Sequence, residues 1–270
     1  MATLLTVTGT QPITPTLRRL WFTSADLSAF ADSAFTDRYV KLMFPRPGVP
    51  LPGADDPRSI DLRTLRATLP PADMPTLRTY TALFPNVEAG TMAIDFVVHG
   101  DAGVAGPWAH AAEVGDSVLV NGPGGAYAPD PTAAWHLLAG DESAIPAISA
   151  AAAALPEDAV GALLVLVDSV DHEPVLTTPA GVVVQFLHRD GTDGQLAAAV
   201  RDLDWPDGRI QAFVHGEAHE VMHEIRPYLF RERKLARRQV SISGYWRRGR
   251  TEEGFRAWKA ELAAAEGATG

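Results

Sequence analysis

Short apolar runs separated by turn residues fill the first half of the chain. Each run is rich in Val, Phe, Tyr and Thr and is bounded by Gly, Pro, Asp or Asn, which is typical of β-strands. Two such runs lie in "LTVTGTQPITPTLRRLWFT", and others are "DRYVKLMFP", "TLRTYTALFP", "TMAIDFVVHG" and "DSVLVNGP". Because no helical pattern separates them, we predict an antiparallel β-barrel or sandwich. Residues 46–75, rich in Pro, Asp and Arg, are predicted to form a long loop with at most a short strand.

The second half of the chain changes to alternating strands and helices. Apolar runs that suit parallel strands are "AAWHLLAG", "GALLVLVDS", "GVVVQFLH", "RIQAFVHGE" and "RQVSISGYW". Helices are expected in "DESAIPAISAAAAAL", "GQLAAAVRDL", "AHEVMHEIRPYLFRE" and "TEEGFRAWKAELAAAE". This alternation predicts a five-stranded parallel sheet covered by helices, an α/β domain. Pro129 and Pro131 punctuate the chain between the halves, so we predict domains at residues 1–129 and 130–270.

Length and composition restrict the class of protein. A chain of 270 residues is long enough for two domains of ordinary size. No apolar run reaches the length that crosses a bilayer, and the start lacks the basic segment of a signal peptide. The absence of cysteine excludes disulfides, thiolate catalysis and iron–sulfur ligation, and it fits a reducing cytoplasm. We expect a cytoplasmic protein, and a monomer because no long coiled-coil pattern is found.

Charge is unevenly distributed along the chain. The sequence has 23 Lys and Arg against 33 Asp and Glu, a formal net charge of −10, which argues against nucleic acid as a partner. Between residues 226 and 256, however, ten Arg or Lys accompany three Asp or Glu. This segment is either a solvated helix face with its following loop or a site for an anionic ligand. Its part "RERKLARR", residues 231–238, offers cations for the 2′-phosphate of NADPH or for a helix C-terminus.

The stretch "RTYT" combines three side chains that suit a bound flavin. Arg78 offers a planar fork for the diphosphate oxygens, Tyr80 an aromatic face for the isoalloxazine ring, and Thr81 a hydroxyl for its N5 region. Because 78 and 80 share one face of a strand, Thr81 would reach the same ligand only near a strand end or a bulge. An amphipathic strand with one solvated face explains the same residues.

A Gly-rich segment follows the next predicted strand. Residues 100–106 let the backbone approach a ligand closely, and "GPWA", which includes Gly106, Trp108 and Ala109, enters a short helix whose amides suit a pyrophosphate. His99, at a strand end, would contact adenine or phosphate, or else cap a turn. The later "GPGGAY" is interpreted as an interdomain turn.

Polar residues also follow two strands of the predicted α/β domain. Asp141, Glu142 and Ser143 come at the end of its first strand, and Glu217 ends its fourth strand in "HGEAHE". The carboxyl ends of parallel strands are where such sheets bind ligands, although "AGDESAIPAI" is not a G-x-G-x-x-G fingerprint. Ser143 is alternatively a helix cap. His219 and His223 have helical metal-ligand spacing but lack the further residues of a metalloprotease motif, so we predict no metal site.

Several segments together resemble the siderophore-interacting protein family of flavin-dependent ferric-siderophore reductases. They are "YVKLMFP", "RTYT", "DFVVHGDAGVAGPWAHAAEVGDSV", "AGDESAIPAI", "HGEAHEVMHEIRPYL" and "GYWRRG", which run in family order from about residue 39 to 249. The resemblance implies a ferredoxin-reductase-like fold, in which an N-terminal antiparallel β-barrel binds FAD and a parallel-sheet α/β domain follows as the NAD(P)H-binding domain.

By this resemblance the flavin is held by Arg78, Tyr80 and Thr81, and its diphosphate and adenine side by His99 and the loop through Gly106, Trp108 and Ala109. The loops around Asp141 to Ser143 and around Glu217 would face the donor nucleotide. A basic cluster lines the substrate pocket in the family, and the local sequence suggests Lys41, Arg247 and Arg248 for it. Lys41 is alternatively a solvent-facing residue of its strand.

The function that the resemblance implies is reduction of ferric siderophores, Fe(III) to Fe(II), by FAD that NAD(P)H or a ferredoxin has reduced. No side chain is expected to act as a catalytic acid or base, because the flavin supplies the chemistry. Two alternatives remain. One is a flavin oxidoreductase of the same plan that acts on another acceptor, and the other is a ferric-siderophore carrier without turnover.

Overall fold

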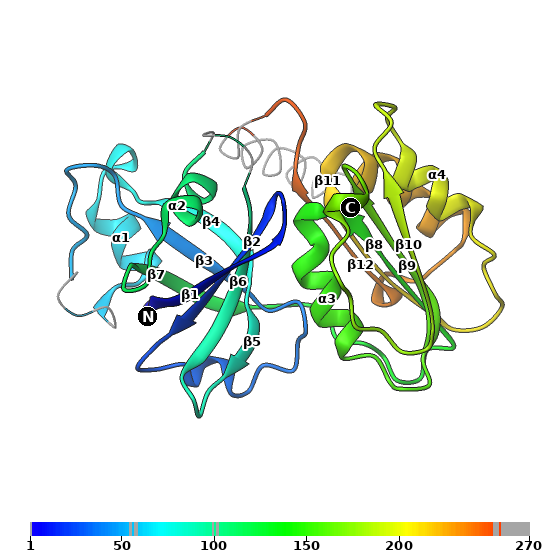
Figure 1. The fold of residues 1–270 in the computed structure, drawn as a ribbon, viewed down its shortest axis with the longest axis horizontal. Coiled ribbons are helices and arrows are strands. Elements are labelled where there is room, and N and C mark those ends of the chain that lie inside the picture. Colours follow the sequence, from blue (N-terminus) through cyan, green and yellow to red (C-terminus); the bar gives the residue numbers. More distant parts are fainter. Residues whose placement is uncertain are drawn as a thin grey trace. The chain divides into compact units, whose positions relative to one another are not determined.

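The protein consists of two compact units, Met1–Ala128 and Pro129–Gly270. Figure 1 shows the computed structural model, which describes residues 2–53, 56, 59–98, 100, 103–250 and 254. The helix expected in "TEEGFRAWKAELAAAE" therefore lies outside the described residues apart from Gly254. Within the part of the chain that is described, no helix is long and apolar enough to span a membrane.

Unit 1 is built on a seven-stranded sheet in which all the paired strands run antiparallel, as predicted. Its strand order is β4-β3-β7-β1-β2-β6-β5. The strands are β1 (Ala2–Thr14), β2 (Leu17–Thr23), β3 (Tyr39–Phe44), β4 (Thr76–Thr81), β5 (Leu83–Asn86), β6 (Thr91–Val97) and β7 (Ser117–Gly124). Tyr80 in edge strand β4 contacts Phe96 in β6, near the other edge, with ring centroids 4.6 Å apart, which shows that the sheet is curled.

The inner face of the curled sheet holds the main core of unit 1. Alternate residues of the strands meet there, among them Leu20 and Phe22 of β2 and Ile94 and Phe96 of β6, all fully buried. Helix α2 (Ala105–Ala111) adds Ala105 and Ala109 to the same cluster. Of the "GPGGAY" segment, which the sequence predicts to be an interdomain turn, residues 122–124 instead extend β7, where Gly124 pairs with Tyr39 of β3, and only residues 125–127 lie outside the strand.

The long segment between β3 and β4 is not the loop that the sequence predicts. It forms helix α1 (Leu62–Thr68) and the 3₁₀ turn η3 (Pro71–Asp73). Asp61 caps α1 by accepting hydrogen bonds from the amides of Arg63 and Thr64 at 2.7 and 3.1 Å. The helix packs on the outer face of the sheet, where its buried Leu62 and Leu65 belong to the same cluster as residues of β3 and β4. A helix of two turns shows too few apolar positions for its period to be recognised.

Unit 2 has the predicted five-stranded parallel sheet, in the order β10-β9-β8-β11-β12. The strands are β8 (Trp135–Asp141), β9 (Val160–Val167), β10 (Gly181–His188), β11 (Ile210–Glu217) and β12 (Val240–Trp246). Helices α3 (Ile145–Ala153) and α4 (Gln195–Asp202) cover opposite faces of the sheet (Figure 1). Short helical turns are η4 (Glu142–Ala144), η5 (Val170–His172) and η8 (Arg237–Gln239).

The predicted helix after β11 exists but is wider than an α-helix over most of its length. It consists of π-helical segments η6 (Glu220–Ile225) and η7 (Tyr228–Glu232), joined by Arg226 and Pro227 in helical conformation. Extended π-helix is rare and is often found at functional sites. This helix directly follows β11. The chain passes outward from β8 through β9 to β10 on one side of the sheet, and then returns to the other side of β8 with β11 and β12, so the strand order reverses between β8 and β11. Ligands of open α/β sheets bind at the carboxyl ends of the strands beside such a switch point.

Candidate functional site

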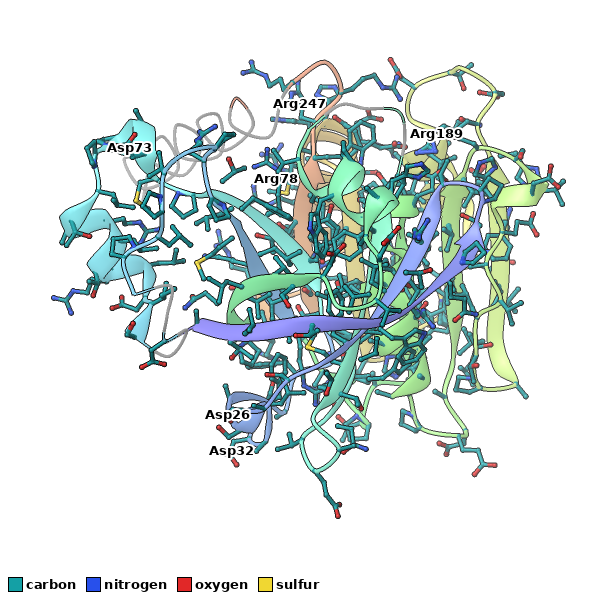
Figure 2. The ribbon with its side chains drawn as sticks, turned by 60° about the vertical axis from the view of Figure 1, so that its left-hand side comes forward. Asp26, Asp32, Asp73, Arg78, Arg189 and Arg247 are labelled. Atoms are coloured by element: carbon teal, nitrogen blue, oxygen red, sulfur yellow. The ribbon has the colours of Figure 1, made fainter. Side chains whose placement is uncertain are left out.

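The side chains of "RTYT" lie on edge strand β4 and alternate between its faces. Arg78 and Tyr80 lie on the inner face, opposite Leu42 and Val40 of β3. Arg78, labelled in Figure 2, is only 8% exposed. Its Nη1 donates a hydrogen bond to the carbonyl of Leu77 at 3.0 Å. Tyr80 is half-buried against Phe96. The opposite face of β4 is partly solvated, because Thr79 is exposed, whereas the charged residue of the stretch, Arg78, is buried on the inner face.

Thr81 and Lys41 lie on the other face of the same two strands. Thr81 is the last residue of β4 and is buried, opposite Tyr39. Lys41 is half-exposed and pairs with the exposed Thr79. Thr81 thus lies at a strand end, one of the two positions from which we expected it to reach the same ligand as Arg78 and Tyr80.

The Gly-rich loop is described only in part, because His99, Asp101 and Ala102 lie outside the described residues. Gly106 is in the first turn of α2, and Trp108 and Ala109 follow in the same helix. The Trp108 ring lies 5.8 Å from that of Phe96 and 5.7 Å from that of Phe44, so the indole joins the aromatic cluster that includes Tyr80. Ala109 is fully buried in the core of unit 1.

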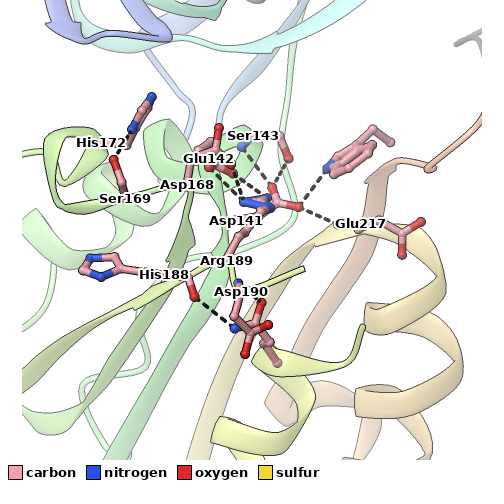
Figure 3. Close-up of polar contacts among 12 residues, drawn as sticks. Asp141, Glu142, Ser143, Asp168, Ser169, His172, His188, Arg189, Asp190 and Glu217 are labelled. Atoms are coloured by element: carbon pink, nitrogen blue, oxygen red, sulfur yellow. Dashed lines mark hydrogen bonds and ion pairs between the residues drawn. The ribbon is translucent and has the colours of Figure 1, made fainter. Parts of the chain in front are cut away.

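In unit 2, Asp141 is a buried carboxylate that connects the ends of three strands. One oxygen accepts hydrogen bonds from the amide and hydroxyl of Ser143, at 2.9 and 2.5 Å. The other accepts from the amide of Glu217 at 2.8 Å and from the indole Nε1 of Trp246 at 2.7 Å (Figure 3). Asp141, not Ser143, therefore caps the turn after β8. Burial raises the pKa of Asp141, whereas these hydrogen bonds act to lower it.

Two glycines make this approach of strand ends possible. Gly140 precedes Asp141, and a Cβ there would overlap the carbonyl oxygen of His215 in β11. Gly216 has φ +150°, and a Cβ there would lie 2.8 Å from a carboxylate oxygen of Asp141. Side chains at either position would push β8 and β11 apart at the switch point.

Glu217 connects the start of the π-helical segment to the loop after β12. Its Oε2 accepts hydrogen bonds from the amides of His219 and Glu220 at 2.7 and 2.9 Å. Its Oε1 accepts from the amide of Arg248 at 3.1 Å and lies 3.9 Å from Nη1 of Arg247. Arg248 also pairs through its guanidinium with Asp193. The structure thus brings Asp141, Ser143, Glu217, Arg247 and Arg248 together.

A second polar cluster lies at the ends of β8, β9 and β10. Arg189, directly after β10, holds Glu142 by two hydrogen bonds of 2.9 and 2.7 Å, and its Nη1 lies 3.4 Å from Asp168, directly after β9 (Figure 3). Burial raises the pKa of Glu142 to about 7, against the opposing effect of the Arg189 charge. Sequence reasoning missed Asp168, Arg189 and Trp246, although each directly follows or ends a predicted strand.

In the described residues, no group of three or more His, Cys, Asp and Glu side chains is placed to hold a metal ion. The rings of His219 and His223 lie 5.2 Å apart in the π-helical segment. Burial, followed by the nearby charge of His219, lowers the pKa of His223.

Comparison with known families and proteins identifies the family of each half of the chain. Residues 6–127 match the siderophore-interacting FAD-binding domain, and residues 133–249 match the siderophore-interacting protein family. The chain is 45% identical over 275 residues to an uncharacterized protein of Mycobacterium tuberculosis, covering 97% of this chain and 96% of that one. It is 33% identical over 250 residues to the ferric vibriobactin reductase ViuB of Vibrio cholerae, covering 90% and 88%.

Solved structures give the same result. The siderophore-interacting protein SipS of Aeromonas hydrophila superposes with a TM-score of 0.79 at 29% identity, over 97% of this chain and 98% of that one. A ferredoxin reductase of carbazole 1,9a-dioxygenase has a TM-score of 0.67 at 14% identity, covering 91% and 70%, which shows the shared fold alone and confirms the predicted ferredoxin-reductase-like architecture. With both of its halves matched and a relative more than 30% identical along most of its length, this chain belongs to the siderophore-interacting protein family.

Proposed function

We propose that the protein is an FAD-dependent reductase that converts the Fe(III) of ferric siderophores to Fe(II), so that the iron is released. The observation that carries the proposal is that a buried guanidinium, Arg78, and an aromatic ring, Tyr80, lie on the same face of β4. This pair lies within the half of the chain that matches the siderophore-interacting FAD-binding domain.

The residues of unit 1 fit FAD. The planar fork of the Arg78 guanidinium can meet two phosphate oxygens at once, which suits the diphosphate. Tyr80 presents a ring that the aromatic cluster around Phe96 holds in place, and Thr81 supplies a hydroxyl at the strand end. When bound, FAD would take up a hydride and deliver electrons singly to iron, and the residues of the chain would bind and orient it.

The electron donor is proposed to be a reduced nicotinamide nucleotide at the carboxyl ends of β8 and β11, with a ferredoxin as the alternative. The switch point and the polar residues around it support this assignment. The four hydrogen bonds of Asp141 all come from the protein itself, so we assign this carboxylate the role of holding the strand ends. Glu142 and Ser143 remain proposed nucleotide contacts.

The substrate is proposed to be an anionic ferric chelate, and the cations proposed to attract it are Lys41 of unit 1 and Arg247 and Arg248 of unit 2. Because the protein as a whole is acidic, an anion would be attracted to such local cations. The hydrogen bond from the Arg248 amide to Glu217 fixes the backbone that carries this arginine pair. The proposed reaction depends on reduced nucleotide or ferredoxin, which suits the cytoplasm.

The test mixes a ferric siderophore with protein whose bound FAD has first been reduced photochemically, and Fe(II) is trapped by a colorimetric chelator. The proposal expects Fe(II) to form faster than with the same concentration of free reduced FAD. It also expects the protein to reduce the ferric siderophore faster than it reduces a quinone or added flavin. Faster reduction of quinone or flavin would identify an oxidoreductase for another acceptor. A colourless protein that binds the ferric siderophore without turnover would identify a carrier.

A further inference from the structure

Tyr39, the first residue of β3, is an aromatic residue that is 38% exposed. It lies directly opposite Thr81 of β4, so the two side chains are on the same face of the sheet, with Cβ atoms about 4.5–5.5 Å apart. Lys41, two residues further along β3, is on this face as well. Tyr39 thus shares a face with the hydroxyl proposed to meet the flavin N5 region and with a cation proposed to attract the ferric chelate.

The ring of Tyr39 lies against the backbone of a third strand. Tyr39 pairs with Gly124, the last residue of β7, and the register between these strands shifts between Tyr39 and Lys41. Such a shift re-aims the side chain beside it. A Cβ at Gly124 would overlap Cζ of the ring and lie 2.8 Å from Cε2. Only glycine at position 124 therefore leaves room for the ring to lie on the chain.

The outer side of this ring is open for stacking. The exposed rings of Trp21 and Phe84 stack on each other, with centroids 6.0 Å apart. Within the part of the chain that the structure describes, no ring contact of this kind is found for Tyr39. A ring that is supported by the backbone on one side and exposed on the other gives a second ring a fixed surface on which to stack.

A planar, aromatic and anionic ligand suits this position. A catecholate group has a ring that can stack on Tyr39 and charged oxygens that Lys41 attracts. A hydroxycarboxylate without a ring gains only from the charge. The isoalloxazine of FAD is also planar, but its proposed partner Tyr80 lies on the opposite face of the same pair of strands, which leaves Tyr39 available to the substrate.

We propose that Tyr39 is a specificity-determining residue of the reductase, on which an aromatic arm of the ferric siderophore stacks while Lys41 attracts its oxygens. The proposal rests on the proposed function, because it concerns the substrate of that reaction. It makes the protein favour ferric chelates that carry catecholate rings over aliphatic chelates that are also anionic.

The experiment titrates the FAD-loaded protein with Ga(III) complexes, which resemble the Fe(III) complexes in charge and size but are not reduced. The aromatic probe is Ga(III) catecholate and the aliphatic probe is Ga(III) citrate, both anionic. The wild type should bind the aromatic probe more tightly. In Tyr39→Ala the Kd for the aromatic probe should rise about fivefold to tenfold, because the stacking is lost, while the Kd for the aliphatic probe changes less than about twofold. Tyr39→Phe keeps the ring and should bind both probes like the wild type.

A second variant moves the ring without removing it. In Gly124→Ala the new methyl group occupies the place of the Tyr39 ring, which can swing away because it is the end of a side chain. The Kd for the aromatic probe should rise as it does in Tyr39→Ala. The matched control is Trp21→Ala, which removes an exposed ring of the same unit and should leave both constants unchanged.

The specificity would be overturned by equal affinity of the wild type for the two probes, or by equal effects of Tyr39→Ala on both. A weaker affinity of Tyr39→Ala apoprotein for FAD, measured by fluorescence, would overturn it too, because the ring would then belong to the cofactor site. The reductase function is tested separately, by adding ferric catecholate to photochemically reduced protein. If iron is reduced but Tyr39→Ala has no selective effect, the reductase stands and the role of Tyr39 is wrong. If the probes bind as expected but iron is not reduced, the reductase function fails and Tyr39 remains a binding residue.

Discussion

At the scale of single residues, Arg78 is the side chain on which cofactor binding depends most. It is charged and buried, and it lies on the same strand face as Tyr80. The proposed diphosphate contact gives this arginine a direct role in binding FAD.

Replacing Arg78 should therefore weaken FAD binding. We expect Arg78→Ala to raise the Kd for FAD by about tenfold or more, because at least one hydrogen bond to a charged group is lost. Arg78→Lys should recover only part of the affinity, since an ammonium cannot form the bidentate contact. Fluorescence quenching of FAD on titration with apoprotein measures both. Arg63→Ala, which changes an exposed arginine of α1, is the control and should bind FAD like the wild type. Equal affinity in Arg78→Ala would refute the assignment.

Glu142 should make stability depend on pH. Its pKa rises from 4.5 to about 7 on folding, so between these values the folded state holds a proton that the unfolded state releases. Its contribution to the free energy of unfolding is therefore greatest below pH 4.5 and falls as the pH rises toward 7. Urea unfolding between pH 5 and 7 should show a shallower decline in Glu142→Gln than in the wild type. Parallel pH profiles for the two proteins would contradict the raised pKa.

The candidate site could be located from the sequence, but its internal contacts could not. Asp141 and Glu217 were selected because they end parallel strands, and the structure places both at the switch point. Their partners depend on the register of three strands that are distant in sequence. The indole of Trp246, for example, lies 105 residues away from Asp141 along the chain. For the same reason, Asp168 and Arg189 were not recognised as neighbours of Glu142.

At the scale of elements, strands were predicted more reliably than short helices. Alternating and continuous apolar runs identified the sheets, since burial on one or both faces is visible in the sequence. Helix α1 was missed because its apolar residues cover only two turns. Its N-cap, Asp61, whose side chain accepts hydrogen bonds from two backbone amides, was not recognised either. The apolar pattern after β11 predicts a helix but does not distinguish the observed π-helical form from an α-helix.

The close approach of β8 and β11 makes a specific prediction. A methyl group in Gly140→Ala would overlap the backbone of β11, which cannot move aside as a side chain can. We expect a loss of about 1–3 kcal/mol in the free energy of unfolding, measured by urea denaturation. Gly9→Ala in β1 is the control, because a Cβ there would lie an ordinary 3.8 Å from its nearest neighbour. If Gly140→Ala is as stable as Gly9→Ala, the strand ends are not packed as described.

At the scale of the whole molecule, the uneven charge should govern substrate binding. The net charge of −10 disfavours anions over most of the surface, so an anionic chelate depends on local cations such as Arg247 and Arg248. The same attraction should weaken as salt is added. A neutral ferric chelate should be insensitive to both effects.

Replacing Arg247 tests this directly. In Arg247→Ala the KM for an anionic ferric siderophore should rise about tenfold, while kcat and the KM for a neutral ferric hydroxamate stay close to wild type. Steady-state kinetics with trapped Fe(II) give both constants. Arg250→Ala, which changes an exposed arginine three residues further on, should leave them unchanged. A similar rise for the neutral chelate would mean that the substitution perturbs the fold instead of the charge.

The central claim is that this chain carries FAD and uses it to reduce siderophore iron. The most direct test is a single turnover without oxygen, in which the FAD-loaded protein is reduced photochemically, freed of reductant and mixed with excess ferric siderophore. Our account predicts that the flavin absorption returns as Fe(II) forms, with about two Fe(II) for each FAD. A protein that takes up no FAD, or reduced FAD that stays reduced in the presence of the ferric siderophore, would contradict it.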